Sequence, residues 1–365
     1  MLYAYSHSPI PVYFAKNSDN FIVRECLAYE LLGQGEWLYL NIEKKDMSTP
    51  ELLKYLSSEL GVKQSDLGYA GLKDKQGLTS QWISLPKRYE SELSCLNKIK
   101  IKDCALHENK LKIGHLKGNS FFIRLKKVNP TDAKKLTQVF ESIAQQGFAN
   151  YFGFQRFGKS KDNFNEGLDI LRGKLRFRDK KLAKFLVQSA QSELFNKILE
   201  QRLMYSHFAQ EFSAKEIESI LKKDFPLASK YLAQAAKYLK KQKTPFKLLL
   251  GDLFEHFPKG RLFYENENEL ERFLEKDISP TGILLGGKSM QPQGFAALVE
   301  ESITKDFTEL FAKENGARRH FWSFADECKS KYDEKSAQFS LEFFLQKGCY
   351  ATVLLEELLH VNVEQ

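Results

Sequence analysis

The stretch "GYAGLKDKQGLTSQWISLP", residues 68–86, places one acid in a loop that leads into a strand. Asp74 stands between Lys73 and Lys75, with a glycine on either side of the group. Glycine lets the backbone bend sharply and approach a large substrate closely. The "QWISL" segment that follows has the alternation and residue types of a strand. An acid presented by a loop beside a strand is typical of catalytic placement.

The two lysines that flank Asp74 suggest why the acid stands there. Ammonium groups nearby favour the charged form of a carboxylate, which a nucleophile or a base needs at neutral pH. The alternative is an exposed aspartate in a turn, as most such residues are. No second carboxylate is spaced for acid–base pairing, so hydrolysis by a pair of acids is not favoured. The sequence therefore predicts Asp74 as a catalytic residue that stays ionised in a cleft.

Length and composition limit the class of protein. The chain has 365 residues, of which 42% are hydrophobic and 13% aromatic, so it can bury a core and is too long for one typical domain. The net charge of +8 favours a polyanionic partner over an acidic one. Five scattered cysteines without a Cys-x-x-Cys pair indicate neither disulfides nor a zinc site. With no secretory signal and no apolar run of about 20 residues, we expect a soluble cytoplasmic protein.

Periodicity predicts a mixed first part of the chain. Alternation indicates strands, and apolar residues at helical spacing indicate helices that start at cap residues and end at glycine. We expect strands at 21–26, 37–42, 81–85 and 120–128 and helices at 48–61 and 130–147. The first of these helices should bury Leu53, Leu56 and Leu60. In the strand at 120–128, Phe121, Ile123 and Leu125 should share one face.

The middle of the chain has a different texture. Residues 160–300 are mostly helix-like and Lys-rich, and strand alternation returns only in "QFSLEFFL" at 338–345. "GCYATVLLEELL" at 348–359 then reads as a turn that leads into a closing helix. Strands at both ends with helices between them predict an α+β fold with an inserted, mostly helical domain, whose host is completed by the C-terminal segment.

Two further segments could bind nucleic acid. "NYFGFQRFG" at 150–158 mixes four aromatic rings and two glycines with Gln155 and Arg156, which suits stacking on bases and gripping phosphates. The same segment could equally pack its rings inward at a domain junction, and its spacing does not decide between the two. "LKGNSFFIRL" at 116–125 offers the amide of Asn119 and the ring of Phe121, although Phe121 also fits a core position.

Two basic clusters and one apparent motif complete the pattern. "GKLRFRDKKLAK" at 173–184 and "YLKKQK" at 238–243 could follow a phosphate backbone or simply be solvated faces. "GILLGGKS" at 282–289 satisfies the formula of a phosphate-binding loop, which works only between a buried strand and a long helix. The charged, proline-broken residues before it and "MQPQG" after it predict a turn-rich loop instead.

Three of these stretches together resemble the TruD family of tRNA pseudouridine synthases: "AGLKDKQGLTSQ", "LKGNSFFIRL" and "NYFGFQRFG". "FIVRE", "SPTG", taken as a Pro-Thr-Gly turn, and "GCYATVLLEEL" extend the similarity over essentially the whole chain. The resemblance implies a pseudouridine-synthase catalytic domain, 1–147 plus 308–365, with a mixed, largely antiparallel sheet, and an inserted TRUD domain at 148–307. It implies isomerisation of uridine at position 13 of tRNA without a cofactor or a metal. Nothing in the sequence demands a protein partner or more than a monomer.

The resemblance also implies roles for individual residues. Asp74 matches the catalytic aspartate of the family, and Phe21, Asn119 and Tyr350 match positions that contact the target nucleotide. The family usually has Phe where this chain has Tyr350, and a small residue such as Ala where it has Gly77. Further substrate contacts are expected from Lys16, as the basic partner of the acid, and from Phe121, Lys73, Lys75, Gln155 and Arg156.

Two other functions fit parts of the same pattern. A non-catalytic RNA-binding protein would use the same aromatic and basic stretches and would not need Asp74. A nucleotide hydrolase built on the "GGKS" loop would need Lys288 and magnesium.

Overall fold

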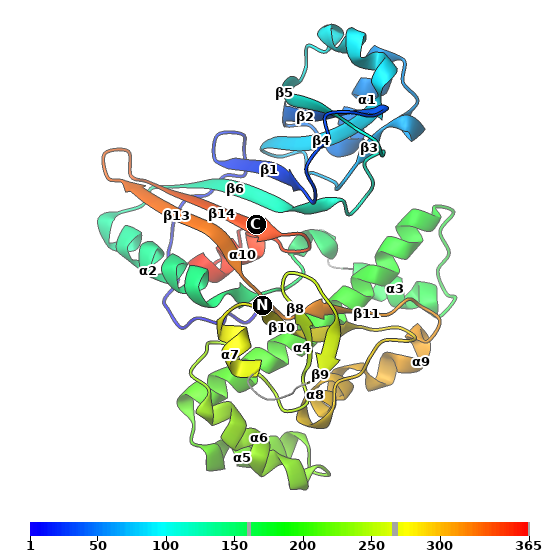
Figure 1. Ribbon diagram of the computed structural model, residues 1–365. Coiled ribbons are helices and arrows are strands. Elements are labelled where there is room, and N and C mark those ends of the chain that lie inside the picture. The colour runs from blue at the N-terminus through cyan, green and yellow to red at the C-terminus, as the bar shows by residue number, and fades with distance from the viewer. Residues whose placement is uncertain (159–161, 265–268, 364–365) are drawn as a thin grey trace. The chain divides into compact units, whose positions relative to one another are not determined.

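The computed structural model describes residues 1–158, 162–264 and 269–363 and divides into two compact units (Figure 1). The first, here called the sheet unit, is Ile10–Glu141 with Ala325–Gly348. The second, the helical unit, is Met1–Pro9, Ser142–Phe324 and Cys349–Gln365. The expected catalytic and inserted domains, 1–147 plus 308–365 and 148–307, have other bounds than these units, and that division stays a prediction.

An eight-stranded sheet forms the sheet unit, in the order β13-β14-β6-β1-β4-β2-β5, with β3 paired to β4. Only β1 and β4 run parallel among the neighbours, so the sheet is mixed and largely antiparallel, as predicted. The strands are β1 (Phe21–Leu27), β2 (Trp37–Lys45), β3 (Gly68–Tyr69), β4 (Leu78–Pro86), β5 (Lys100–His107), β6 (Leu116–Lys126), β13 (Ala325–Asp333) and β14 (Gln338–Gln346). Short 3-10 helices lie at Gln64–Asp66 and Lys87–Cys95, and α2 spans Pro130–Gln146.

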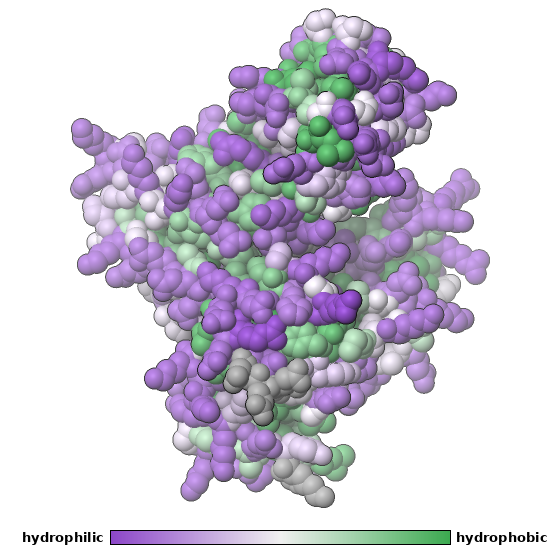
Figure 2. Space-filling view, viewed as in Figure 1, coloured by the Kyte–Doolittle hydropathy of each residue, from purple (hydrophilic) through white to green (hydrophobic). Residues whose placement is uncertain are grey.

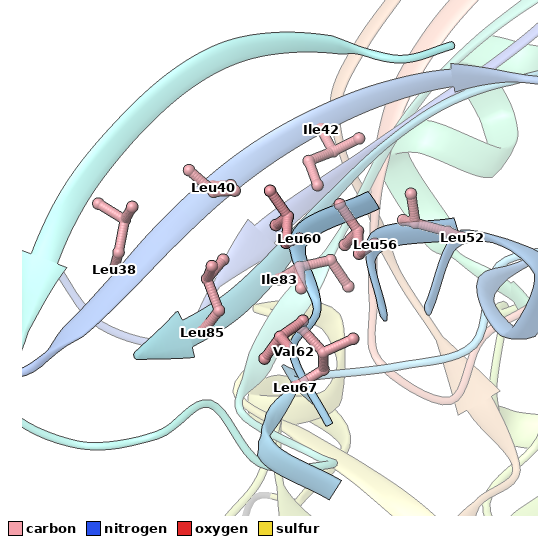
Figure 3. Close-up of a cluster of buried hydrophobic side chains, with 10 residues drawn as sticks. All are labelled: Leu38, Leu40, Ile42, Leu52, Leu56, Leu60, Val62, Leu67, Ile83 and Leu85. Carbon is pink, nitrogen blue, oxygen red and sulfur yellow. The ribbon is translucent and has the colours of Figure 1, made fainter. Parts of the chain in front are cut away.

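Helix α1 (Thr49–Leu60) packs its apolar face on this sheet. It begins with a capping box between Ser48 and Glu51 and ends at Gly61, which has a φ of +66° that suits glycine. Leu56 and Leu60 are buried as predicted, but Leu52 is buried where Leu53 was expected, and Leu53 is half-buried. Figure 3 shows the resulting core of Leu38, Leu40, Ile42, Leu52, Leu56, Leu60, Val62, Leu67, Ile83 and Leu85.

The helical unit is rich in helix, as predicted. Its helices are α3 (Asn163–Leu171), α4 (Lys180–Glu211), α5 (Ala214–Asp224), α6 (Ser229–Lys241), α7 (Glu269–Leu274), α8 (Gly294–Thr304), α9 (Thr308–Phe311) and α10 (Ala351–Leu359), with 3-10 turns at Phe154–Arg156 and Lys305–Phe307. It also holds strands that the sequence did not predict. A four-stranded sheet has the order β11-β10-β8-β9, and β12 pairs with β7. These are β7 (Phe148–Ala149), β8 (Leu253–His256), β9 (Leu262–Tyr264), β10 (Ile278–Leu284), β11 (Ala317–His320) and β12 (Trp322–Ser323).

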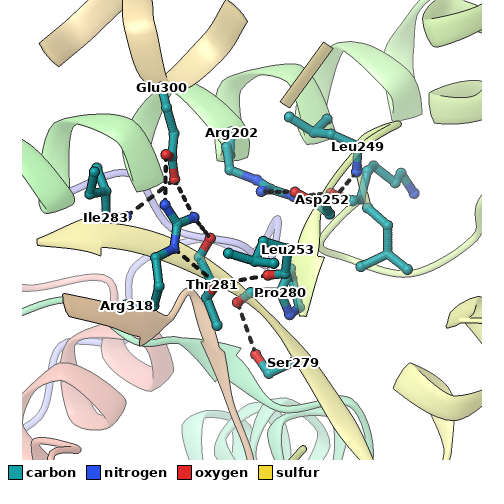
Figure 4. Close-up of polar contacts among 12 residues, drawn as sticks. Arg202, Leu249, Asp252, Leu253, Ser279, Pro280, Thr281, Ile283, Glu300 and Arg318 are labelled. Carbon is teal, nitrogen blue, oxygen red and sulfur yellow. Dashed lines mark hydrogen bonds and ion pairs between the residues drawn. The ribbon is translucent and has the colours of Figure 1, made fainter. Parts of the chain in front are cut away.

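The expected turn at "SPTG" is wrong, because these residues lie in the buried strand β10. Gly282 is needed there because a Cβ would lie 2.3 Å from the Phe321 ring. Figure 4 shows how polar groups beside the strand are satisfied: Thr281 Oγ1 donates to the carbonyl of Leu253, and Arg318 pairs with Glu300. The "GGKS" loop after it does meet a buried strand, but α8 begins only at Gly294. The long helix that a phosphate-binding loop needs does not follow directly.

Candidate active site

The loop that carries Asp74 lies between β3 and β4 in the sheet unit, and its main chain is fixed to the start of α1. The backbone N–H of Lys73 donates to Thr49 Oγ1 at 2.8 Å, and the Lys73 carbonyl accepts from the Thr49 N–H at 3.2 Å. Thr49 Oγ1 donates in turn to Gln81 on β4 at 2.9 Å. The residue directly before Asp74 is therefore held to the helix by two hydrogen bonds, and a third links the same helix residue to the sheet.

The side chains of the two flanking lysines extend this anchoring. Lys73 Nζ lies 2.5 Å from Glu25 Oε2, and the two side chains are 7% and 0% exposed. Glu25 Oε1 accepts from the Trp82 N–H at 3.1 Å, which ties the ion pair to the sheet. Lys75 Nζ pairs with Glu51 on α1 at 2.9 Å, and both of these side chains are exposed. Each lysine thus has a carboxylate partner other than Asp74.

Asp74 itself pairs with a lysine that is distant in sequence. Lys16 Nζ lies 3.3 Å from Asp74 Oδ2, and the Lys16 side chain is only 16% exposed. The same ammonium lies 5.3 Å from the centre of the Phe21 ring. The Asp74 side chain is 55% exposed, so within the sheet unit it is not enclosed by a cleft. The geometry places an accessible carboxylate beside a cation and an aromatic ring.

Three of the predicted substrate contacts share one face of the sheet. Strand β1 pairs with β6 so that Glu25 opposes Asn119 and Val23 opposes Phe121, and directly opposed residues point to the same face. Phe21 lies two residues before Val23 and therefore shares this face. The Phe21 and Phe121 rings are 6.1 Å apart. The fold thus gathers Phe21, Asn119 and Phe121 on the face that also carries Glu25, the partner of Lys73.

Two buried polar atoms on this face have no hydrogen-bond partner among the residues that the structure describes. They are Oδ1 of Asn119 and Oγ1 of Thr79, and Thr79 opposes Val23 in the parallel pairing of β1 with β4. Buried acceptors are almost always paired, so an orphan needs an explanation. A bound ligand with hydrogen-bond donors would provide that explanation. Such a ligand would donate to the side-chain amide of Asn119, which the sequence predicted as a substrate contact.

Lys44 is a neighbour of the site that the sequence analysis missed. It lies on β2, is buried, and donates to the Met47 carbonyl. Burial, with the nearby Lys73 ammonium, lowers the Lys44 pKa to about 8, while the Asp74 charge opposes this shift. Strand alternation gave the signal, because Leu38, Leu40 and Ile42 continue to Lys44 on the same buried face.

Gly77 closes the Asp74 loop and leaves no room for a side chain. Its φ is +104°, and a Cβ would lie 2.7 Å from the Phe21 carbonyl oxygen and 3.1 Å from the Phe21 ring. In this chain the glycine therefore brings the end of the loop against Phe21. An alanine, which the resemblance suggests at this position, would displace one of the two.

The remaining predicted contacts belong to the helical unit. Tyr350 is the N-cap residue of α10 and is half-buried, with its ring 6.3 Å from that of Phe152. The guanidinium of Arg319, which the sequence analysis missed, lies 4.0 Å from the centre of the Phe152 ring. Gln155 is exposed in the 3-10 turn at Phe154–Arg156. The segment at 150–158 thus presents partly exposed rings as well as packing others inward, since Tyr151 is buried.

Arg156 is held by α4. Its Nε donates to Ser192 Oγ at 3.2 Å and its Nη2 to Gln188 Oε1 at 3.3 Å. The guanidinium also lies 5.0 Å from the centre of the Phe185 ring. These contacts set the direction of the arginine, so it is a positioned cation of the helical unit.

Comparison with known proteins decides the family. The sequence profile described as "tRNA pseudouridine synthase D (TruD)" matches residues 1–178 and 255–358, well over half of the chain. The chain belongs to the tRNA pseudouridine synthase D family. Curated relatives with that name are 53% identical in Campylobacter jejuni, over 99% of this chain and 96% of theirs, and 44% identical in Helicobacter pylori, over 100% and 97%.

A solved structure from the same family confirms the fold. A protein from Methanosarcina mazei, described as a candidate tRNA pseudouridine synthase D, matches 99% of this chain and 96% of its own with a TM-score of 0.66 at 21% identity. Members of the family are isomerases that convert uridine to pseudouridine in tRNA, so this chain is a tRNA-modifying isomerase. No helix among the described residues is long and apolar enough to span a membrane.

Proposed function

We propose that this chain isomerises uridine at position 13 of tRNA and that Asp74 is its essential carboxylate. The observation that carries the proposal is the pairing of the accessible Asp74 carboxylate with Lys16 beside the Phe21 ring. The contact holds the carboxylate beside the ring on which a base could stack. The relatives' names support tRNA as the substrate. A tRNA substrate also fits the expected cytoplasmic location, while the absence of a cofactor, a metal and an obligate protein partner stays a prediction.

The reaction breaks the bond from ribose C1′ to N1 of uracil, turns the base and forms a bond from C1′ to C5. A proton leaves C5 and one is gained at N1, so no atom is added or lost. An ionised Asp74 can act as a nucleophile at the base or the sugar, or as the base that removes a ribose proton. All three routes use the same charged oxygen, and they differ in the atom that it attacks.

The target base must leave the stack before it can react, which costs a few kcal/mol. Stacking on an aromatic side chain returns about 1–3 kcal/mol per base. Phe21, Phe121 and Tyr350 are the proposed stacking residues. The unpaired Oδ1 of Asn119 would accept the N3–H of uracil. Lys73 and Lys75 would act by holding the loop, and Gln155 and Arg156 by contacting the RNA strand.

Replacing Asp74 with Asn tests the proposal. Pseudouridine at position 13 of a tRNA transcript, measured by mass spectrometry in single-turnover reactions, should form at least about 10²–10⁴-fold more slowly. The Kd for the same transcript should change less than threefold. Asp103→Asn, the same change at an exposed residue of β5, serves as the control. Unchanged activity of Asp74→Asn would refute the catalytic role, and wild type that modifies another position would refute the site on the tRNA.

A further inference from the structure

A strongly basic surface covers the junction of α3 and α4. It consists of seven exposed side chains, here called the α4 basic surface: Arg172, Lys174, Arg176, Arg178, Lys180, Lys181 and Lys184. Arg172 pairs with Asp169 at 3.5 Å, and within the described residues the other six make no ion pair. The one acid in this stretch, Asp179, is occupied as the N-cap of α4 and accepts from the N–H groups of Lys181 and Leu182. The surface therefore keeps its charge.

Helix stability does not explain this placement. Lys180 and Lys181 lie in the first turn of α4, which has no acidic residue, and the positive end of a helix dipole disfavours cations there. The other lysine runs of the unit stand in last turns, where cations are stabilising. Those residues are Lys222, Lys223, Lys240 and Lys241. Lys240 also donates to the Ala209 carbonyl, so the predicted cluster at 238–243 has a structural explanation. Lys180 and Lys181 have no such explanation.

The same helix connects this surface to Arg156. Lys184 is followed one turn later by Gln188, which is about 6 Å along the helix axis, and Gln188 accepts from Arg156. Arg156 belongs to the segment whose Phe152 ring lies beside Tyr350. Figure 1 shows the turn between α3 and α4 at the edge of the ribbon, and hydrophilic side chains project from that region in Figure 2. Basic side chains thus lead along one helix toward residues proposed to contact the RNA.

We propose that the α4 basic surface binds the phosphodiester backbone of the tRNA outside the target nucleotide. The inference rests on the proposed function, because it assigns part of the binding energy for that substrate. Contacts of lysine and arginine with phosphates give affinity and position, without reading sequence. The surface should therefore lower the Kd and the KM for tRNA and leave the chemical step unchanged.

A triple charge reversal tests this surface: Lys180→Glu, Lys181→Glu and Lys184→Glu. Acids in the first turn favour a helix, so the variant should fold as well as wild type, which a thermal melt checks. Each lost phosphate contact lowers the slope of log K against log salt by about 0.7–0.9, so the loss of three contacts should raise the Kd by a factor of about 100–500 at 0.1 M salt. At saturating tRNA, kcat should stay within twofold of wild type. Lys237→Glu, Lys241→Glu and Lys243→Glu change the charge equally on other exposed residues and serve as the control.

A Kd within threefold of wild type and an unchanged salt slope would overturn the inference, as would an equal loss in the control. Intact tRNA binding with lost binding to phosphatidylglycerol vesicles would assign the surface to a membrane and also overturn it. If the triple reversal does not fold, the corresponding Lys→Gln variant decides by the same criteria. Wild type without pseudouridine formation would refute the proposed function, whereas an active wild type with an unaffected triple variant would refute only this surface.

Discussion

The buried ion pair between Glu25 and Lys73 allows a quantitative test of how the Asp74 loop is held. Glu25→Gln removes one charge and keeps an oxygen for the Trp82 N–H, but it leaves the Lys73 ammonium buried beside a neutral amide. Breaking a buried pair in this way costs about 3–5 kcal/mol, and Lys73→Met should cost a similar amount. The double variant removes both charges and keeps the Trp82 hydrogen bond. We therefore expect it to lose less than about 2 kcal/mol, well below the sum of the single losses.

Urea unfolding at pH 7 measures the free energies, and single-turnover pseudouridine formation measures the effect on Asp74. Because Lys73 directly precedes Asp74, the Lys73→Met variant should lose kcat and keep its KM within threefold, and Lys73→Arg should recover part of the rate. Lys75→Met is the matched control, since an exposed pair such as Lys75–Glu51 is worth about 0–1 kcal/mol. If the double variant loses as much stability as both single variants together, the two charges do not interact and the described anchoring is wrong.

Two further predictions concern stability and the loop. Glu357 is buried and accepts from the Ala4 and Tyr5 N–H groups, and burial raises its pKa from 4.5 to about 7. The folded state then binds more protons than the unfolded state between those values, so stability falls by about 3 kcal/mol as the pH rises through this window. In Glu357→Gln, the amide oxygen can accept both hydrogen bonds. This variant should raise the free energy of unfolding by up to about that amount at pH 8 and by little at pH 4.5. Equal gains at both pH values in urea unfolding would contradict this prediction. Gly77→Ala should cost about 1–3 kcal/mol because of its φ and the Phe21 contact, and an unchanged unfolding midpoint would show that the loop can relax.

Elements that depend on local chemistry were predictable. Strands β1, β2, β6 and β14 follow from alternation, and α1 from its cap residues and its terminal glycine. The exact helix face was less certain, because Leu52 and Leu53 are both leucines and only packing on the sheet selects Leu52. Strand β10 was missed because its Pro-Thr-Gly sequence reads as a turn, while the surrounding rings require a glycine in a strand.

The sequence named several residues that the fold brings together, including Lys16 beside Asp74, but not all of their neighbours. Asp74, Phe21, Asn119 and Phe121 were identified from motifs, and the register of β1 with β6 brings the last three to one face. Lys44 was overlooked because a lysine at the end of an apolar alternation is ordinarily solvated. The alternation of Leu38, Leu40 and Ile42 nevertheless places it on the buried face.

The lysines around Asp74 show why adjacency in sequence misled the electrostatic interpretation. The side chains of Lys73 and Lys75 reach different neighbours. Lys73 reaches inward to Glu25 and Lys75 reaches the first turn of α1, so each anchors one side of the loop. The cation that pairs with Asp74 is Lys16, 58 residues earlier. The two adjacent lysines therefore fix where the loop stands, and the distant lysine contacts the carboxylate itself. Removing an adjacent lysine should disturb the position of the loop, whereas removing Lys16 should leave the loop in place and remove a direct contact of the carboxylate.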